Sequence, residues 1–360
     1  AMDDVRVPDV AMAFFDLVAV VDHTSRLLFL LYCPPMDRFL GEPREKLYRE
    51  GCDRLSALEA VLSSRTSYVE PPAPLDKAHF HPEQTREQYV AGVRQCQQYI
   101  AAGDIYQANL SHRFRLSLDD VLGARSRDEA SLALYRRLRR INPSPFSNLA
   151  RFGDVSLVSC SPERLVRLDA SRASTRPIAG TRPRGHRAEE DGRLRDELLH
   201  SAKERAEHLM LVDLERNDLG KVCAYGSVRV DEFMTIERYS HVNHLVSDVH
   251  GTLRPGTDPL DLVRAVFPGG TITGVPKVRC MEIIEELEPV RRGLYTGSLG
   301  YFSWSGDLDL NILIRTLVLT QGRGYLQVGA GIVADSVPDK EYEETLSKAA
   351  AFFRILEERS

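Results

Sequence analysis

The short apolar segments of this chain cluster together, and this clustering limits its fold more than any other feature. Four of them follow one another between residues 146 and 180 without a helix between them, as FSNLARF, VSLVSCSP, RLVRLDA and ASTRPIAG. Runs of this length, bounded by turn residues, predict strands joined by tight turns. A doubly wound parallel sheet needs a helix between successive strands. The sequence therefore predicts an α+β protein with antiparallel or mixed sheets, and not a Rossmann fold.

The same kind of pattern predicts the other elements. Residues 13–32 predict a strand hairpin that turns at residues 22–25. Longer strands are predicted at 105–118, 308–319 and 325–336, and two strands between residues 228 and 253. Amphipathic spacing predicts helices at 41–64, 85–99 with Thr85 as cap, 128–142, 189–220 with a break near His200, 258–267, 276–289 and the C-terminus.

Composition excludes several classes of protein. The 47 basic and 52 acidic residues give a formal net charge of −5, which offers no reason to expect nucleic-acid binding. No apolar run approaches the roughly 20 residues that cross a bilayer, and the N-terminus does not resemble a signal peptide. The 6 cysteines are scattered without zinc-like spacing, which indicates reduced thiols in a cytoplasmic protein.

Two Glu-x-x-Glu pairs, Glu204 with Glu207 and Glu341 with Glu344, lie in predicted helices. Residues three apart share one helix face, so each pair presents two carboxylates together. A single pair of this kind is usually a solvated helix face. Two pairs brought together would repel unless a cation neutralised them, and all-oxygen ligation suits Mg²⁺ with an anionic substrate.

Three more residues are unusual for their surroundings. Glu163, in SCSPERLV, follows a strand end in an apolar stretch, where a raised pKa would let it act as a general acid. Arg315 is a charge inside an apolar segment and needs an anion, such as a substrate carboxylate. His244 is more simply a core histidine than a catalytic one. His241 and His244 would face opposite sides of a strand, which argues against a shared metal.

Three glycine-rich segments, 177–185, 267–277 and 328–336, could each hold an anion with backbone N–H groups. None of them meets the spacing of a nucleotide-binding loop, so each is by itself a tight turn more often than a site. Taken with the acidic pairs, Glu163 and Arg315, they indicate a small dicarboxylate held partly by metal and partly by arginine.

Beyond this reasoning, six motifs of the chain resemble, in order and spacing, those of the chorismate-utilising enzyme family. They are GDIYQANLSHRF, SCSPERLV, PIAGTRPRG, LMLVDLERNDLG, FPGGTITGVPK and GAGIVADSVPDKEYEETLSKA. The resemblance runs from about residue 8 to the end. It implies two large β-sheets packed face to face with helices outside, and an active site between them. It also implies one domain over residues 1–360, with 1–85 as part of an N-terminal sheet region and linker and 86–360 as catalytic core. Members of the family usually have a longer N-terminal region, so the chain is expected to begin partway through its first sheet.

The resemblance also implies roles for individual residues. Glu207 and Glu344 would ligate magnesium, with Glu204 and Glu341 in support, and the ion would hold the ring carboxylate of chorismate. Glu163 would protonate the departing 4-hydroxyl. The implied substrate-binding positions are Tyr295, Arg315, Gly329 and Gly331 for the enolpyruvyl carboxylate, and Ala179, Gly180, Thr181 and His244 around the ring.

Two positions discriminate within the family. Gln107 stands where water-using members carry a lysine base, and a glutamine cannot take that role, so ammonia is the expected nucleophile. Ala179 stands where many enzymes that make 4-amino-4-deoxychorismate carry a lysine that attacks the ring, so that covalent route is excluded here. The FPGGTITG and YTGSLGYF segments favour 4-amino-4-deoxychorismate as product. Anthranilate, with release of pyruvate, is the alternative.

No glutaminase nucleophile arrangement is evident, so the ammonia is expected from a separate glutamine amidotransferase subunit.

Two other classes of protein are less consistent with the sequence. A non-enzymatic binding protein on this fold would be expected to lose Glu163 or a metal ligand. A di-iron carboxylate protein would need Glu-x-x-His, whereas Glu207 follows Glu204 at that spacing.

Overall fold

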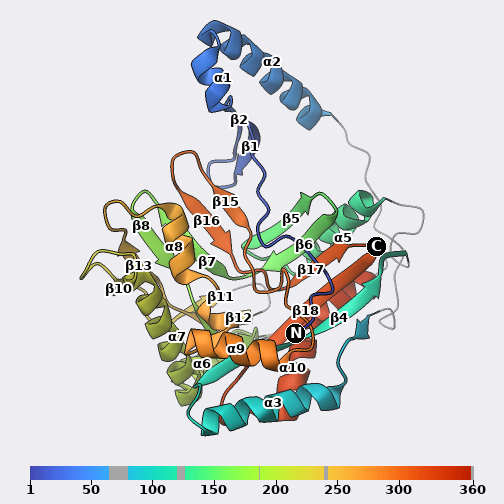
Figure 1. Ribbon diagram of the computed structural model, residues 1–360, viewed down its shortest axis with the longest axis vertical. Coiled ribbons are helices and arrows are strands. Elements are labelled where there is room, and N and C mark those ends of the chain that lie inside the picture. The colour runs from blue at the N-terminus through green and yellow to red at the C-terminus, as the bar shows by residue number, and fades with distance from the viewer. Residues whose placement is uncertain (65–79, 120–125, 186, 239–241, 358–360) are drawn as a thin grey trace. The chain divides into compact units, whose positions relative to one another are not determined.

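The computed structural model describes residues 1–64, 80–119, 126–185, 187–238 and 242–357, and Figure 1 shows the course of the chain. The chain forms two compact units, one of residues Pro8–Glu70 and one of Ala1–Val7 with Pro71–Ser360. The single domain expected over residues 1–360 stays a prediction.

The smaller unit contains the predicted hairpin. Strands β1 (Leu17–Asp22) and β2 (Leu27–Tyr32) pair antiparallel, and the Asp22 carboxylate accepts hydrogen bonds from the Thr24 and Ser25 backbone N–H groups in the turn. Helices α1 (Met36–Gly41) and α2 (Arg44–Ser63) follow. An aspartate that bonds to the backbone beyond it is a local turn signal, which is why the sequence predicted this hairpin correctly.

The larger unit is built on two large antiparallel sheets and one small sheet. The seven-stranded sheet has the order β14-β4-β18-β17-β6-β5, with β3 also on β4. Its strands are β3 (His81–Pro82), β4 (Gln107–Ser117), β5 (Phe146–Phe152), β6 (Val155–Ser161), β14 (Gly274–Val275), β17 (Thr316–Thr320) and β18 (Arg323–Ile332).

The six-stranded sheet has the order β10-β13-β8-β7-β16-β15, and the small sheet the order β11-β12-β9. Their strands are β7 (Arg164–Asp169), β8 (Arg172–Thr175), β9 (Ile178–Pro183), β10 (Arg229–Val230), β11 (Thr235–Arg238), β12 (Val242–Val246), β13 (Val249–Thr252), β15 (Gly300–Phe302) and β16 (Leu308–Asn311). The prediction of an α+β protein with two large sheets is confirmed, and the third sheet was not predicted.

Helices pack against these sheets and supply the core. They are α3 (Arg86–Ala101), α5 (Arg127–Ile141), α6 (Ala188–His200), α7 (Ala202–Gly220), α8 (Pro259–Val266), α9 (Lys277–Leu287), α10 (Pro338–Glu357) and the 3₁₀ turn η2 (Gly270–Ile272). Figure 1 shows α3 and α10 alongside β4 and β18. Thr85 caps α3 in a capping box with Gln88, and the helix predicted to break near His200 divides at Ser201.

The two faces of β4 differ in chemistry. Phe114 and Leu116 point into a core completed by α5 and α10. The alternate residues Gln107, Asn109 and Ser111 are polar yet almost fully buried. Successive strand residues point to opposite faces, so this alternation gives the seven-stranded sheet one apolar face and one buried polar face.

Among the described residues, the chain passes directly from one sheet to another at five places, two of them within residues 228–253. The other three lie beside predicted site residues. These are Pro162–Glu163 between β6 and β7, Arg176–Pro177 between β8 and β9, and residues 312–315 between β16 and β17. The single strand predicted for 308–319 was therefore wrong, as was the single strand predicted across ASTRPIAG. Both halves of each segment are buried in sheets, so their hydrophobic pattern does not reveal the break. Proline at two of the crossings fits, since it cannot donate to a ladder.

The region 228–253 also differs from expectation. It holds four short strands, β10 to β13, in place of the two predicted, and they belong to two different sheets.

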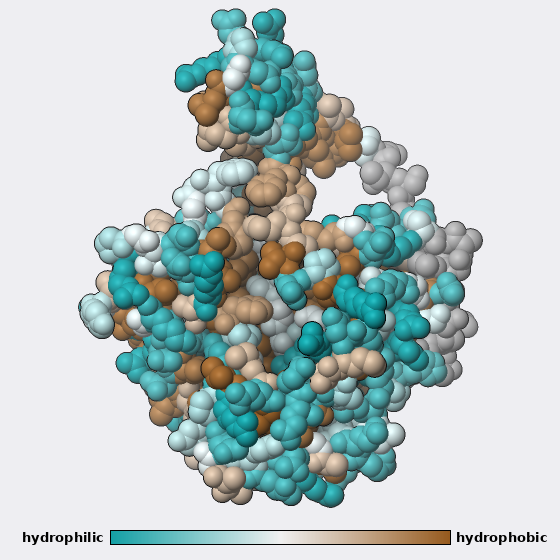
Figure 2. Space-filling model, in the orientation of Figure 1, coloured by the Kyte–Doolittle hydropathy of each residue, from teal (hydrophilic) through white to brown (hydrophobic). Residues whose placement is uncertain are grey.

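Figure 2 shows a mostly hydrophilic exposed face with scattered hydrophobic patches. Of the helices that the structure describes, none is both long and apolar enough to cross a membrane.

Candidate active site

Glu163 lies at the crossing from β6 to β7 and is only 6% exposed. Its backbone carbonyl accepts a hydrogen bond of 3.0 Å from the Ile312 N–H, which ties this crossing to the one that follows β16. Burial raises the pKa of the Glu163 carboxyl to about 7, and the Thr271 side chain and the Lys348 ammonium offset only part of that effect. A carboxyl group with this pKa can hold a proton near neutral pH and give it up during a reaction.

Arg315 lies at the crossing from β16 to β17, with a left-handed φ of 51°. Its carbonyl accepts from the Cys160 N–H at 3.0 Å, so the crossing runs beside the end of β6. Burial lowers the pKa of the Arg315 guanidinium, although Tyr295, Glu344 and Glu163 favour its charged form. In the described part of the chain no carboxylate lies within the 4 Å of an ion pair with it. The sequence wrongly placed Arg315 within a strand, but its need for an anionic partner stands.

Two glycines of β18 face polar side chains from β4 and from the segment before β15. A Cβ on Gly329 would lie 2.8 Å from Tyr295 Oη, and one on Gly331 would lie 2.6 Å from Gln107 Nε2. The Lys348 ammonium donates a 2.8 Å hydrogen bond to the Gly329 carbonyl. The structure thus brings together four of the sequence-predicted residues, Gln107, Tyr295, Gly329 and Gly331, on one patch of the sheet.

Ala179, Gly180 and Thr181 lie on β9, where the pairing with β12 shifts register between His244 and Leu245. Gly180 has φ +80°, and a Cβ there would lie 2.9 Å from Glu204 Oε2, so only glycine fits. Burial lowers the pKa of His244 to about 4, which leaves the imidazole neutral near pH 7. The Thr181 backbone pairs with His244, but the Thr181 side chain lies outside the described part of the structure, as does His241.

The four predicted metal ligands gather from two helices, Glu204 and Glu207 on α7 and Glu341 and Glu344 on α10. Burial raises the pKa of Glu207, and the other three carboxylates raise it further. Burial likewise raises the pKa of Glu341, and Glu344 adds to it. Carboxylates that disfavour one another's charge in this way could hold a divalent cation through oxygen ligands alone.

Cations of the protein itself lie beside these carboxylates. Lys348 is 2.8 Å from Glu344, Arg182 is 3.0 Å from Glu204, and Lys203 is 3.7 Å from Glu207. Among the described residues, the only set of three potential ligands within 4.8 Å of one another lies elsewhere, at Asp231, Asp248 and His250. The composition of the acidic cluster therefore fits magnesium, while its assignment as a metal site stays a prediction.

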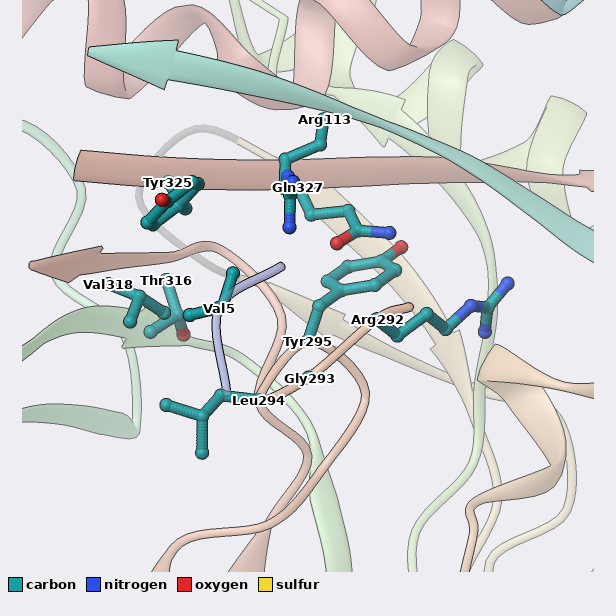
Figure 3. A pocket seen from close by; sticks show the side chains of 10 residues that line it. All are labelled: Val5, Arg113, Arg292, Gly293, Leu294, Tyr295, Thr316, Val318, Tyr325 and Gln327. Carbon is teal, nitrogen blue, oxygen red and sulfur yellow. The ribbon is translucent and has the colours of Figure 1, made fainter. Parts of the chain in front are cut away.

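A cavity adjoins this site and shares Tyr295 with it. Figure 3 shows the Tyr295 ring beside Gln327, with Arg292 nearby. Gln327 donates to Ser111 Oγ at 2.8 Å, and Ser111 Oγ donates to Glu288 at 2.7 Å. This network fixes the polar face of the sheet next to Tyr295. The residues that line the cavity are Val5, Arg113, Arg292, Gly293, Leu294, Tyr295, Thr316, Val318, Tyr325 and Gln327.

Sequence reasoning missed two residues of this region. Lys348 follows Glu344 by one helical turn, so the i,i+4 spacing was an available signal. Glu215 is 7% exposed on α7, and burial raises the pKa of its carboxyl to about 8. Its position in LVDLERND, on the stripe that carries Glu207 and Leu211, could have marked it as inward-facing.

Comparison with known proteins gives the family. Residues 1–354 match the family model described as chorismate binding enzyme. The chain belongs to the chorismate-binding enzyme family. It is 47% identical over 361 residues to aminodeoxychorismate synthase component 1 of Bacillus subtilis, which covers 99% of this chain and 73% of that protein.

It is also 46% identical over 355 residues to anthranilate synthase component 1 of Thermus thermophilus, which covers 99% of this chain and 72% of that protein. The solved structure of anthranilate synthase component I from Streptococcus pneumoniae superimposes with a TM-score of 0.85 at 34% identity, covering 98% of this chain and 75% of that one. The family inferred from the motifs is confirmed, and so is the fold class.

Proposed function

We propose that this chorismate-utilising enzyme aminates chorismate with ammonia to give 4-amino-4-deoxychorismate. The choice of ammonia as nucleophile is supported by the burial of Gln107 and by its side-chain oxygen, which is unpaired among the described residues. Its side chain is 7% exposed, and within the described structure its Oε1 has no hydrogen-bond partner. An amide cannot remove a proton from water, but its oxygen can accept a hydrogen bond from ammonia and orient the nitrogen for attack.

The remaining side chains supply binding and acid catalysis. Arg315, with Tyr295 and the Gly329–Gly331 backbone beside it, binds the enolpyruvyl carboxylate of chorismate. Glu163 gives its proton to the C4 hydroxyl, so that the C–O bond breaks and water departs. Support for this role comes from a pKa raised to about 7 by burial, because a large share of the acid is then protonated near neutral pH.

Magnesium fits the cluster of Glu204, Glu207, Glu341 and Glu344, and it would neutralise and orient the ring carboxylate of chorismate. Glu207 and Glu344 are the proposed direct ligands. Lys203 and Lys348 pair with these two carboxylates, and both ammonium groups would have to release them for the cation to bind. Gly180 is required here because a side chain at that position would displace Glu204.

One observation supports this choice of product. Similarity over nearly the whole chain to aminodeoxychorismate synthase component 1 of Bacillus subtilis favours retention of the pyruvyl group. Ala179 provides no amine for a covalent adduct, so nitrogen reaches C4 without an enzyme-bound intermediate. Ammonia is supplied by a glutamine amidotransferase partner, as the "component 1" names of the relatives suggest. The cytoplasmic location stays a prediction.

Anthranilate synthesis is the second candidate, and His244 is the specific observation that favours it. That reaction removes the proton from C2 and eliminates pyruvate. Burial lowers the pKa of His244 to about 4, so its imidazole is neutral near pH 7 and could accept that proton. The similarity to anthranilate synthase component 1 of Thermus thermophilus points the same way.

The two candidates are separated by the fate of the pyruvyl group. The protein is incubated with chorismate, magnesium and ammonium, and pyruvate release and anthranilate fluorescence are followed. We expect no pyruvate until an aminodeoxychorismate lyase is added, and then 4-aminobenzoate with one pyruvate for each. Stoichiometric pyruvate and anthranilate without the lyase would replace the first candidate by the second.

A further inference from the structure

A buried ion pair beside Tyr295 has no role in the reaction proposed above. Arg292 lies between α9 and β15, three residues before Tyr295, and Glu288 is the residue that follows α9. The Arg292 side chain is 13% exposed and the Glu288 side chain 3% exposed. The guanidinium donates to both carboxylate oxygens, from Nε at 2.9 Å and from Nη2 at 2.6 Å. Two parallel hydrogen bonds to one carboxylate fix the plane of the guanidinium.

The terminal nitrogens of this guanidinium also donate to two backbone carbonyls from distant parts of the chain. Nη1 donates to the Ile272 carbonyl in η2 at 2.8 Å, and Nη2 donates to the Asn109 carbonyl in β4 at 2.5 Å. Asn109 Nδ2 donates to the same Ile272 carbonyl at 3.2 Å. Glu288 Oε1 in turn accepts from the Ser111 N–H at 2.9 Å and from the Ser111 hydroxyl at 2.7 Å. The ion pair is therefore tied to β4 and to η2, and it cannot move without leaving buried groups unpaired.

The Tyr295 ring lies beside the guanidinium that these bonds hold (Figure 3). The Tyr295 N–H donates to the Arg292 carbonyl at 3.0 Å, which closes a tight turn. The Arg292 Cζ lies 5.5 Å from the centre of the Tyr295 ring, a distance at which a cation attracts an aromatic face. At the end of the ring, Tyr295 Oη lies 2.8 Å from the position that a Cβ on Gly329 would take. The orientation of the ring thus decides where its hydroxyl meets β18.

We propose that Arg292 is a positioning residue for substrate binding, which sets the Tyr295 ring so that its hydroxyl meets the enolpyruvyl carboxylate. The charge of Arg292 is already matched by Glu288, so this guanidinium does not compete with Arg315 for that carboxylate. A hydroxyl displaced by about 1 Å would lose its hydrogen bond to the substrate, so a side chain that never touches chorismate can still govern its affinity. The inference rests on the proposed role of Tyr295, and it holds for either product because both reactions begin with bound chorismate.

Arg292→Ala tests the support of the ring. In the presence of magnesium and without ammonium, the calorimetric dissociation constant for chorismate should rise about tenfold or more. In turnover assays KM for chorismate should rise in parallel, with a smaller fall in kcat. Millimolar guanidinium should fill the space left by the side chain and restore much of the affinity. Methylammonium at the same ionic strength should not, because it lacks the planar fork that binds a carboxylate and carbonyls together.

Arg291→Ala is the matched control, because this neighbouring arginine is 59% exposed and lies 3.7 Å from Glu285. It should bind chorismate as the wild type does, with or without guanidinium. Wild-type affinity in Arg292→Ala as well would overturn the proposal.

A double-mutant cycle with Tyr295→Phe separates positioning of the hydroxyl from a general effect on the fold. Once the hydroxyl is gone, Arg292→Ala should cost little further affinity, and guanidinium should restore none. Equal losses with and without the hydroxyl would leave Arg292 a structural residue. If Tyr295→Phe itself binds chorismate as tightly as the wild type, the proposed role of Tyr295 fails first. Arg292→Lys keeps a charge beside Glu288 but cannot reach all three partners, so it carries the same cycle if Arg292→Ala does not fold.

Discussion

Gln107 and Gly331 fit against each other so closely that a Cβ on Gly331 would lie 2.6 Å from Gln107 Nε2. The two residues come from β4 and β18, which pair in register along their length. The Gln107 amide therefore occupies space that any side chain at position 331 on the facing strand would fill. This relationship matters because the Gln107 oxygen is the proposed acceptor for ammonia.

Gly331→Ala tests this relationship. The new methyl group should push the Gln107 amide aside, and a displacement of about 1 Å can cost on the order of a hundredfold in rate. We expect kcat/KM for ammonium to fall by about tenfold to a hundredfold, a larger loss than that in chorismate affinity, which calorimetry measures. Gly192→Ala is the matched control, since a Cβ there has nothing within 4 Å. Equal kinetics in Gly331→Ala and Gly192→Ala would show that Gln107 does not bind the ammonia.

Glu163→Gln tests the acid. The amide preserves size but has no proton of suitable acidity, so kcat should fall by about 10²–10⁴-fold while chorismate still binds. In the wild-type enzyme, kcat should decline as pH rises through about 7, because Glu163 then loses its proton. A profile of kcat against pH measures this decline. If the same decline appears in Glu163→Gln, it belongs to a group other than Glu163.

Glu344→Gln tests the proposed magnesium site. Loss of this carboxylate should weaken magnesium binding about 10-fold or more and lower turnover in parallel, with calorimetric titration of magnesium as a readout independent of activity. Glu343→Gln is the control, because that neighbouring side chain is exposed and only pairs with Arg86 at 3.3 Å. Full activity of the wild-type enzyme in excess chelator would contradict the assignment.

Acid stability should depend on His112. Its Nε2 donates to Thr345 Oγ1 at 2.7 Å, its Nδ1 is buried without a partner among the described residues, and burial lowers its pKa from 6.5 to about 4. Between these two values the unfolded chain binds a proton that the folded chain does not. The contribution of His112 to stability is therefore complete above pH 6.5 and falls by about 3 kcal/mol as pH drops towards 4.

Urea unfolding of the wild-type protein and His112→Gln at a series of pH values measures this contribution. The difference in unfolding free energy between the two proteins should shrink as pH falls through that window. The buried acids Glu163 and Glu215 act in the opposite direction, but equally in both proteins. His81→Gln, at an exposed position, should follow the wild type at every pH. A constant difference between wild type and His112→Gln would mean that His112 is not buried in its neutral form.

Local sequence signals were enough for much of the secondary structure. The Asp22 turn, the Thr85 capping box and the break at Ser201 each depend on contacts within a few residues, so they are legible in the chain itself. Motif spacing was also enough to indicate the family, which the comparison confirmed. The pairs Glu204–Glu207 and Glu341–Glu344 were visible because a helix places residues three apart on one face.

Contacts between distant segments were decided only by the tertiary structure. Arg315 looked like a strand residue because both of its flanks are apolar, yet it lies where the chain leaves one sheet for another. Gln107 and Gly331 meet through strand pairing that no local pattern specifies. Glu163 and Glu215 are both buried in the packed molecule. The raised pKa values of the two acids follow from burial, which is a property of the packed molecule and not of the residues themselves.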